Sequence, residues 1–321
     1  MFEKPPSGFL RFSGDQSLET MTLGTTSTRR PQSTLVTGAG GFLGRHFVAS
    51  LEAAGHRVRA LHRSSPTRDA GHSELVVGDL LDGHALRSAV HGMECVVHLA
   101  GLAHILVPRS RGLADFVRVN VDGTAALFDE AARAGVKTFV LLSSVAAVCR
   151  TSETPVHEGS APLPQTAYGI SKLEAEKVVL DGGREWGMRV IVIRPPLVYG
   201  PGMKGNPLRL FDLIARGVPL PLRSVRNRRS MLFVGNLVSS VIALLEEPES
   251  TQEIFCVADH EATSTPEFIR EVAAMMGVGA RLFPMPMPLL YAVGRISDVA
   301  APLWTVPFGR DAAAGVAGSL V

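Results

Sequence analysis

The sequence predicts an α/β fold in which a doubly wound parallel sheet carries helices on both faces and is followed by a smaller C-terminal lobe. From Ser33 onward, short runs rich in β-branched residues alternate with amphipathic stretches, which is the order that parallel strands and crossover helices require. Several of these stretches end at a glycine, the residue that most often terminates a helix. After Pro195 the alternation fades and Gly and Pro become common, which marks the start of the smaller lobe.

The individual elements follow from these patterns. The apolar runs predict six strands: Thr34–Thr37, Arg57–His62, Glu74–Gly78, Glu94–Leu99, Thr138–Ser143 and Arg189–Arg194. Helical spacing predicts four helices between them: Phe42–Ala54, Gly83–Val90, Phe116–Ala134 and Tyr168–Glu185. Three shorter helices are predicted in the remainder: Pro207–Arg216, Asn236–Glu246 and Pro266–Met276. We expect a disordered extension over residues 1–32, the sheet domain over 33–200 and the smaller lobe over 201–321, from which the chain crosses back to the sheet.

Composition restricts the classes of function. A chain of 321 residues with 46% hydrophobic residues can bury a large core, and a net charge of +2 with scattered arginines gives no footprint for a nucleic acid. Three cysteines far apart in the chain favour a reducing, cytoplasmic location and provide no metal site, and His98 is expected to be a packed strand histidine. Apolar runs are shorter than the roughly 18 residues of a membrane span. We therefore expect a cytoplasmic protein with no membrane span, no nucleic-acid partner and no metal.

A glycine-rich turn lies between the first predicted strand and the first predicted helix, in the sequence TGAGGFLG. In this context Gly38 permits a tight turn, Gly41 lets the backbone approach a pyrophosphate, and Gly44 allows close packing of the helix. The helix N-terminus adds N–H donors and a partial positive charge. Such a turn can also be a plain connector, but the strand, turn and helix together favour dinucleotide binding. The predicted contacts in this turn are Gly38, Gly41, Phe42, Leu43 and Gly44.

The spacing GxxGxxG resembles that of the extended short-chain dehydrogenase/reductases, in the NAD-dependent epimerase/dehydratase family, and the resemblance extends from Ser33 to about Leu290. It implies a Rossmann-like doubly wound sheet, a C-terminal substrate-binding lobe and a nicotinamide cofactor. Where NAD-binding members end the second strand with an acidic residue, this chain has His62 and then Arg63. Pairing of Arg63 with a 2′-phosphate favours NADP over NAD, and a solvated arginine at a strand end is the alternative.

Further cofactor contacts follow from the resemblance. Asp79 and Leu80 match the adenine-contacting pair of the family, and the alternative is an Asp turn or a helix cap. Leu99 and Ala100 end the fourth strand at the edge where ligands of such sheets bind. Pro195 belongs to a strand-to-loop motif that passes the nicotinamide in related proteins.

The catalytic residues are predicted from one helix and one strand end. Tyr168 and Lys172 lie four residues apart at the start of a predicted helix, so both project from one face, although a surface pair has the same spacing. Ser144 follows the fifth strand and matches the family's third catalytic residue, which leaves Ser143 a structural role. The resemblance makes Tyr168 the proton shuttle, Ser144 the hydrogen-bonding partner of the reacting oxygen, and Lys172 the ammonium that lowers the phenol pKa. Tyr168 and Lys172 are also predicted to contact the cofactor and Ser144 the substrate, while Asn120 supports the site.

The second half of the chain points to the substrate. The family's 4,6-dehydratases carry an Asp–Glu pair after the catalytic residue, and Val145 and Ala146 at this place argue against a dehydratase. Arg229 matches an arginine that grips a nucleotide diphosphate, while a surface arginine is the alternative. Asn206 lies in a run that resembles members acting on N-acetylated UDP-hexoses. Leu197 replaces an asparagine that several members use on the diphosphate, which leaves the sugar open.

Three functions remain open at this point. The first is a 4-epimerase of UDP-glucose or UDP-N-acetylglucosamine, which oxidises and re-reduces the sugar with a retained cofactor. The second is an NADPH-dependent 4-ketoreductase of a UDP-4-keto-6-deoxy-sugar, which the end of the second strand favours. The third is a non-catalytic dinucleotide-binding sensor, against which the intact catalytic residues argue. We expect a UDP-sugar as substrate and a homodimer formed through the helices that begin at Phe116 and Tyr168.

Overall fold

Residues 32–65, 74–103, 112–203, 206–247, 253–289, 292 and 318–321 are described in the computed structural model of the chain. The chain divides into two compact units. The first comprises Met1–Arg150, His157–Val198 and Leu232–His260, and the second comprises Thr151–Val156, Tyr199–Met231 and Glu261–Val321. The extension predicted over residues 1–32 lies outside the described residues, apart from its last residue.

The first unit is built on a seven-stranded sheet with the strand order β3-β2-β1-β4-β5-β6-β9. Its strands are β1 Ser33–Thr37, β2 Arg57–His62, β3 Glu74–Val77, β4 Cys95–His98, β5 Thr138–Leu142, β6 Arg189–Arg194 and β9 Ile254–Cys256. Every neighbouring pair is parallel. The winding reverses between β1 and β4, and ligands of such sheets bind at the carboxyl ends of the strands near that point. The Rossmann-like fold class is therefore confirmed.

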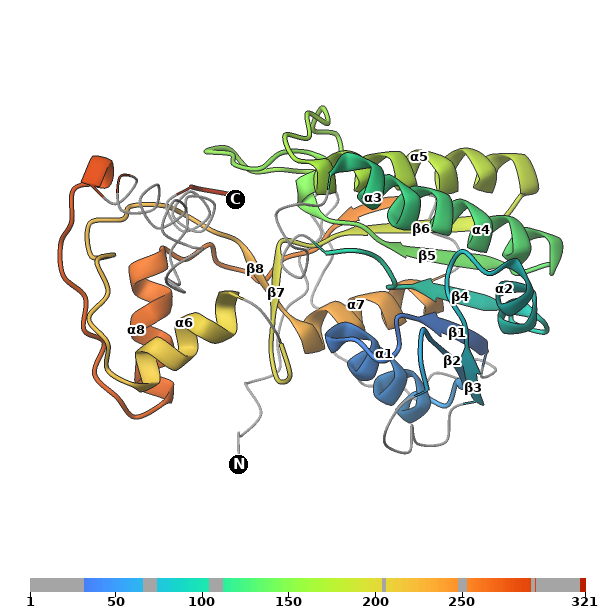
Figure 1. The fold of residues 1–321 in the computed structure, drawn as a ribbon, viewed down its shortest axis with the longest axis horizontal. Coiled ribbons are helices and arrows are strands. Elements are labelled where there is room, and N and C mark those ends of the chain that lie inside the picture. The colour runs from blue at the N-terminus through green and yellow to red at the C-terminus, as the bar shows by residue number, and fades with distance from the viewer. Residues whose placement is uncertain are drawn as a thin grey trace. The chain divides into compact units, whose positions relative to one another are not determined.

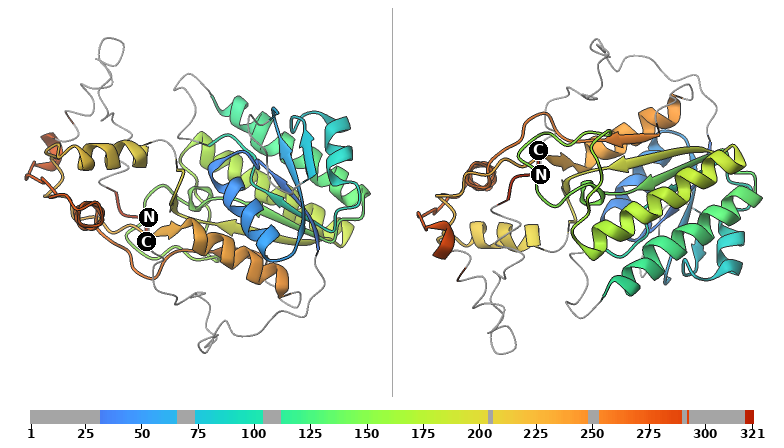
Figure 2. Two further views of the ribbon diagram at one scale, coloured as in Figure 1. Left: turned by 90° about the horizontal axis from the view of Figure 1, so that it is seen from below. Right: turned by 90° about the horizontal axis from the view of Figure 1, so that it is seen from above.

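Helices cover both faces of this sheet. They are α1 Phe42–Ala53, α2 Gly83–Val90, α3 Leu113–Val117, α4 Gly123–Arg133, α5 Ala167–Trp186 and α7 Val234–Glu246. Figure 1 shows α1 and α7 on one face and α2, α4 and α5 on the other, and Figure 2 shows the same two layers from below and from above. Phe47 and Leu237 belong to the buried apolar cluster of the first face, and Leu86, Phe128 and Val179 belong to that of the second. Burial of these two clusters holds the helices to the sheet.

Capping residues set the ends of helices α2 and α5. Asp82 precedes α2 and its carboxylate accepts hydrogen bonds from two N–H groups of the first turn. Thr166 does the same for α5, where its hydroxyl oxygen accepts from the N–H of Gly169 at 3.0 Å. Gly187 ends α5 with a positive φ of 64°, which a glycine adopts without strain. The chain thus enters and leaves α5 at fixed points.

The elements differ from the predicted ones in two respects. The helix predicted over Phe116–Ala134 begins earlier, at Leu113, and contains a π turn, η2 Arg118–Asp122, between α3 and α4. The strands β9, β7 Leu197–Tyr199 and β8 Met231–Phe233 lie outside the predicted strands, and β7 pairs with β8. Each has three residues, which is too short for a recognisable period. Their pairing partners rather than their own sequences define them.

The second unit has its own apolar cluster between two helices, α6 Asn206–Ala215 and α8 Thr265–Met275. Ile214 of α6 and Ile269 of α8 are both 3% exposed or less and anchor that cluster. A capping box and a proline define the start of α8. Among the residues that the structure describes, no helix is long and apolar enough to cross a membrane.

Candidate active site

The three residues predicted to be catalytic lie at the carboxyl edge of the sheet in the first unit. Ser144 stands two residues after the end of β5 and begins a short 3-10 helix, η3 Val145–Ala147, where its hydroxyl oxygen accepts from the N–H of Ala146 at 3.2 Å. Tyr168 and Lys172 lie in the first two turns of α5. One strand end and one helix start therefore carry all three side chains.

The start of α5 packs directly on the loop that carries Ser144. A Cβ atom at Gly169 would lie 2.2 Å from the carbonyl oxygen of Ala146, so no larger residue fits there. This close approach brings Tyr168 to Ser144, whose hydroxyl acts to lower the pKa of the phenol. The geometry places a potential proton donor beside a second hydroxyl group, as an acid–base site needs.

Lys172 is the buried cation of this site. Its side chain is 7% exposed, and Nζ donates a hydrogen bond to the carbonyl oxygen of Leu142 at 2.8 Å. Burial lowers the pKa of Lys172 to about 8, and the carboxylate of Glu176 opposes that effect. Lys172 is therefore still largely charged at neutral pH, but by a smaller margin than an exposed lysine.

Tyr168 differs from the sequence-based expectation. The ammonium of Lys172 was expected to lower the phenol pKa, whereas burial raises the pKa of Tyr168 to about 12, partly offset by the hydrogen bond to Ser144. The edge of the Phe116 ring lies against Tyr168, with 6.2 Å between the ring centroids, and adds to the burial. Because Lys172 is directed to a backbone carbonyl, desolvation dominates, and the phenol holds its proton at neutral pH.

Asn120 ties the segment after β4 to α5. Its side chain, in the π turn η2, accepts from the N–H of Leu102 at 2.7 Å and donates to the carbonyl of Leu102 at 3.1 Å. The same amide donates to the hydroxyl of Ser171 at 3.0 Å. A Cβ at Gly101 would lie 2.9 Å from the amide oxygen of Asn120 and 3.6 Å from Nζ of Lys172. This crowding disfavours a larger residue at position 101.

The glycine turn has the geometry of a phosphate cradle. Gly38 has a φ of +68°, and a Cβ there would lie 2.8 Å from the backbone nitrogen of Ala100. A Cβ at Gly44 would lie 2.2 Å from the carbonyl oxygen of Gly38, so α1 packs against the turn only with glycine there. Gly41 precedes α1 and no side chain caps that helix. The first N–H groups of α1, which include those of Phe42 and Leu43, therefore suit an anionic ligand. The positive end of the helix dipole lies at the same place.

A buried histidine connects this turn to the catalytic side of the sheet. Thr124 donates its hydroxyl to the carbonyl of Asn120 at 2.6 Å, so it accepts from Nε2 of His98 at 3.0 Å. Nδ1 of His98 then accepts from the hydroxyl of Thr37 at 2.7 Å, and Thr37 accepts from the N–H of Ala100 at 3.2 Å. Burial lowers the pKa of His98 to about 3, so this ring is neutral. The expectation of a packed strand histidine is confirmed, and Thr37, the first residue of the TGAGGFLG segment, belongs to the same network although the sequence predicts no role for it.

The end of β2 lies beside the glycine turn. A Cβ at Gly40 would lie 3.0 Å from Nδ1 of His62, the last residue of β2. Arg63 follows directly and is exposed. Asp79 accepts from the N–H of Leu81 at 3.0 Å, which is the Asp turn that the sequence leaves as an alternative to an adenine contact.

The remaining predicted cofactor residues lie at the same edge. Leu80 is 8% exposed, and Leu99 and Ala100 are partly buried directly after β4. Pro195 follows β6, is buried, and accepts a hydrogen bond from the N–H of Val145 at 3.0 Å. This bond fixes the loop after β6 to the loop after β5, where Ser144 lies.

The two predicted substrate residues outside this cluster belong to the second unit. Arg229 pairs through its backbone with Thr263, and burial lowers the pKa of its guanidinium. Within the described ranges, its side chain has no ion-pair partner. Asn206 begins α6, and its side chain lies outside the described residues. Across all the residues that the structure describes, no group of three His, Cys, Asp or Glu side chains could hold a metal ion.

Comparisons with known proteins agree on one family. Residues 34–258 match the NAD dependent epimerase/dehydratase family. The chain is 32% identical over 264 residues to UDP-glucose 4-epimerase of Vibrio cholerae, across 81% of this chain and 80% of the relative. It is 34% identical over 275 residues to ceramide reductase of Caulobacter vibrioides, across 85% of this chain and 79% of the relative.

A solved structure is similar over much the same length. MoeE5 in complex with UDP-glucuronic acid and NAD has a TM-score of 0.67 and 27% identity, and the match covers 79% of this chain and 85% of that chain. The family match includes the glycine turn, Ser144, Tyr168, Lys172 and Arg229.

Proposed function

Because this chain belongs to the NAD dependent epimerase/dehydratase family, of the extended short-chain dehydrogenase/reductase type, we propose that it transfers hydride at C4 of a UDP-sugar, as a 4-epimerase of UDP-glucose or UDP-N-acetylglucosamine. The observation that carries this proposal is the group of Ser144, Tyr168 and Lys172, in which Lys172 is buried and the two hydroxyl residues are partly buried. Ala100 and Gly101 connect this group to the glycine turn, because Ala100 meets Gly38 and Gly101 lies near Lys172. Proton transfer and cofactor binding would then occur at neighbouring points of one edge.

The residues present fit a nicotinamide dinucleotide. The uncapped start of α1 and the glycine turn would hold its pyrophosphate, and Arg63 beside that turn would hold a 2′-phosphate, which favours NADP over NAD. The other proposed contacts are Asp79, Leu80, Leu99, Ala100, Tyr168, Lys172 and Pro195. When bound, the nicotinamide supplies the hydride acceptor and donor. The NAD in the similar MoeE5 complex supports this cofactor class.

The side chains of the site divide the acid–base work. The hydroxyl of Tyr168 takes the proton of the C4 hydroxyl when the alcohol is oxidised, and returns a proton when the ketone is reduced. Ser144 donates a hydrogen bond to the same substrate oxygen. The positive charge of Lys172 favours the phenolate, which burial otherwise disfavours. Val145 and Ala146 after Ser144 offer no carboxylate, so the site has no residues there for eliminating water.

Arg229 and Asn206 are the proposed substrate anchors of the second unit. A guanidinium binds a diphosphate with two parallel hydrogen bonds, and Arg229 has no acidic partner in the described ranges to compete with that contact. The UDP-sugar in the MoeE5 complex and the UDP-glucose 4-epimerase relative support a UDP-sugar as substrate.

A second candidate function is reduction of a ketone by NADPH, as in a 4-ketoreductase of a UDP-4-keto-6-deoxy-sugar. The exposed Arg63 favours this function, because NAD-binding members have an acidic residue at this position. The 34% sequence identity to a ceramide reductase also supports a reductase. A dinucleotide-binding sensor without activity is disfavoured, because Ser144, Tyr168 and Lys172 are all present at one edge of the sheet.

One experiment separates these functions. The protein is purified without added nucleotide and denatured, and the released small molecules are identified by mass spectrometry. Stoichiometric NAD or NADH means a retained cofactor and supports the epimerase. Protein that releases no nucleotide and then binds NADPH more tightly than NADH supports the reductase.

A further inference from the structure

A buried carboxylate lies one helical turn beyond the catalytic lysine. Tyr168, Lys172 and Glu176 are spaced four residues apart on α5, so all three follow the face that packs on the sheet. Glu176 is 1% exposed, which is rare for a glutamate and requires compensating partners. None of the sequence motifs includes it.

The partners of Glu176 come from two strand ends. Its carboxylate accepts a hydrogen bond from the hydroxyl of Ser143, the residue directly before Ser144. It also accepts from Nε of Arg194 at 3.1 Å and from Nη2 at 2.6 Å, and Arg194 is the last residue of β6. The two strand ends are themselves joined, because the N–H of Ser143 donates to the carbonyl of Ile193 at 2.8 Å. One carboxylate therefore holds α5, the end of β5 and the end of β6 together.

The charges around Lys172 make this arrangement functional rather than merely stabilising. The charge of Glu176 on α5 raises the pKa of Lys172, Arg194 on β6 pairs with Glu176, and the charge of Glu158 acts on Arg194 in turn; His98 and Tyr168 are neutral. A buried ion pair gives little net stability over apolar residues of similar size. Arg194 even leaves Nη1 without a hydrogen-bond partner among the described residues. The pair costs stability that an apolar contact would not, and its carboxylate belongs to a residue one turn from Lys172 on the same face of α5.

We propose that Glu176 is a positioning residue, which keeps Lys172 charged and fixes Ser144 through Ser143, with Arg194 as the ion-pair partner of its carboxylate. The role of Lys172 in this inference rests on the proposed function. The effect of Glu176 on the charge of Lys172 does not, and it can be measured without a substrate.

The direct test is a titration of Lys172 by NMR. The chain has five lysines, so protein labelled with ¹³C at lysine Cε gives few signals, and Lys172→Met identifies the one of interest. The variant is Glu176→Gln, which removes the negative charge and keeps a side chain of the same size that can still accept hydrogen bonds from Ser143 and Arg194. We expect the midpoint of Lys172 to fall by about one pH unit, because an opposite charge is lost while Arg194 stays charged. An unchanged midpoint in a folded Glu176→Gln variant overturns the proposal.

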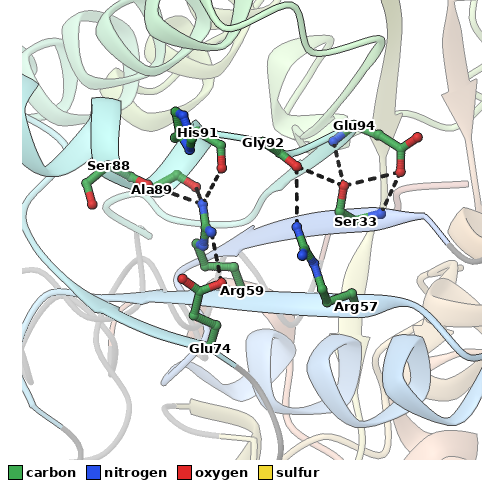
Figure 3. A network of polar contacts seen from close by, with 9 residues as sticks. All are labelled: Ser33, Arg57, Arg59, Glu74, Ser88, Ala89, His91, Gly92 and Glu94. Atoms are coloured by element: carbon green, nitrogen blue, oxygen red, sulfur yellow. Dashed lines mark hydrogen bonds and ion pairs between the residues drawn. The ribbon is translucent and has the colours of Figure 1, made fainter.

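Glu74→Gln is the matched control. Glu74 also pairs with a buried arginine, Arg59, at 2.8 Å, but this pair lies at the opposite edge of the sheet, where Arg59 also donates to carbonyls at the end of α2 (Figure 3). The midpoint of Lys172 should not move in this variant. An equal shift in Glu74→Gln would mean that the loss of any buried ion pair changes Lys172, and the proposal would be wrong.

Enzyme kinetics test the second claim of the proposal, that Glu176 fixes Ser144 through Ser143. Ser143→Ala removes one bond to a charged group, and we expect kcat to fall about tenfold with KM unchanged, while Ser143→Thr restores it. Equal activity of Ser143→Ala and the unmodified chain overturns the link to Ser144. Absence of turnover in the unmodified chain would count against the proposed function alone, because the NMR titration still decides the role of Glu176.

Discussion

Tyr168 and Lys172 set the charge of the site at the scale of single residues. Burial raises the pKa of Tyr168 to about 12 and lowers that of Lys172 to about 8. At neutral pH the site therefore holds a protonated phenol beside an ammonium. This state is ready to donate a proton to a ketone oxygen, and removal of a hydroxyl proton depends on the ammonium staying charged.

The first prediction concerns pH. The protonation state of Lys172 should cause no change in kcat below about pH 8. Above about pH 8, kcat should fall because the lysine loses its proton there. The measurement is the pH dependence of kcat for the unmodified enzyme and for Lys172→Arg, whose guanidinium stays charged. The same alkaline decline in both enzymes would show that another group is responsible.

The second prediction concerns the proton shuttle. Tyr168→Phe keeps the ring that packs against Phe116 but removes the hydroxyl, so kcat should fall by roughly 10²- to 10⁴-fold while the fold is kept. Circular dichroism and titration with the dinucleotide provide the controls. A variant that still turns over at the original rate would remove Tyr168 from the chemistry.

The third prediction concerns cofactor choice. Arg63→Ala should lower the preference for NADPH over NADH, measured as the ratio of the two kcat/KM values, by about 10- to 100-fold, because one charged hydrogen-bonding group is lost. Arg57→Ala is the matched control, since Arg57 is an exposed arginine at the other end of the same strand. If both variants keep the original ratio, Arg63 is a solvated arginine and NADP has no special support.

At the scale of elements, the packing of α1 on the glycine turn can be tested by adding one methyl group. Gly44→Ala would place a Cβ 2.2 Å from the carbonyl oxygen of Gly38, so α1 must move away from the turn. We expect at least tenfold weaker dinucleotide binding and a lower melting temperature. Gly83→Ala, at the start of α2, has open space around the added atom and should change neither property. Equal affinity of both variants would disprove the role of the turn.

The larger elements could be predicted from the sequence because each carries its own signal. The strand Arg189–Arg194 and the helix Gly83–Val90 have the predicted bounds, since an apolar run and a helical period are local properties. The strand β9 could not be predicted, because three residues beside β6 gain their strand geometry only from that neighbour. The π turn in the helix around Asn120 has no sequence pattern of its own either.

The same distinction applies to the site. Motifs led to Ser144 and Tyr168 because their spacing in the chain is characteristic, and the structure brings both side chains together. Glu176 and Thr37 act through partners that are distant in the sequence, Arg194 and His98, so no local pattern reveals these contacts, although Thr37 opens the glycine-rich segment. Buried polar networks of this kind become visible only when the fold has placed their members.

At the scale of the whole molecule, we expect two copies to associate. Helices α4 and α5 lie side by side on one face of the sheet, and symmetric pairing of such helices gives a closed dimer (Figure 1). Light scattering should report twice the chain mass of 34.2 kDa. A single-chain mass at all concentrations tested would contradict this expectation.

The most direct test of the proposed function is incubation of the purified protein with UDP-glucose and UDP-N-acetylglucosamine, without added cofactor, followed by chromatography of the nucleotide sugars. We predict that the C4 epimer of at least one substrate forms with the unmodified chain and not with Tyr168→Phe. If no epimer forms with the unmodified chain, even after NAD or NADP is added, the protein is not a 4-epimerase of these sugars.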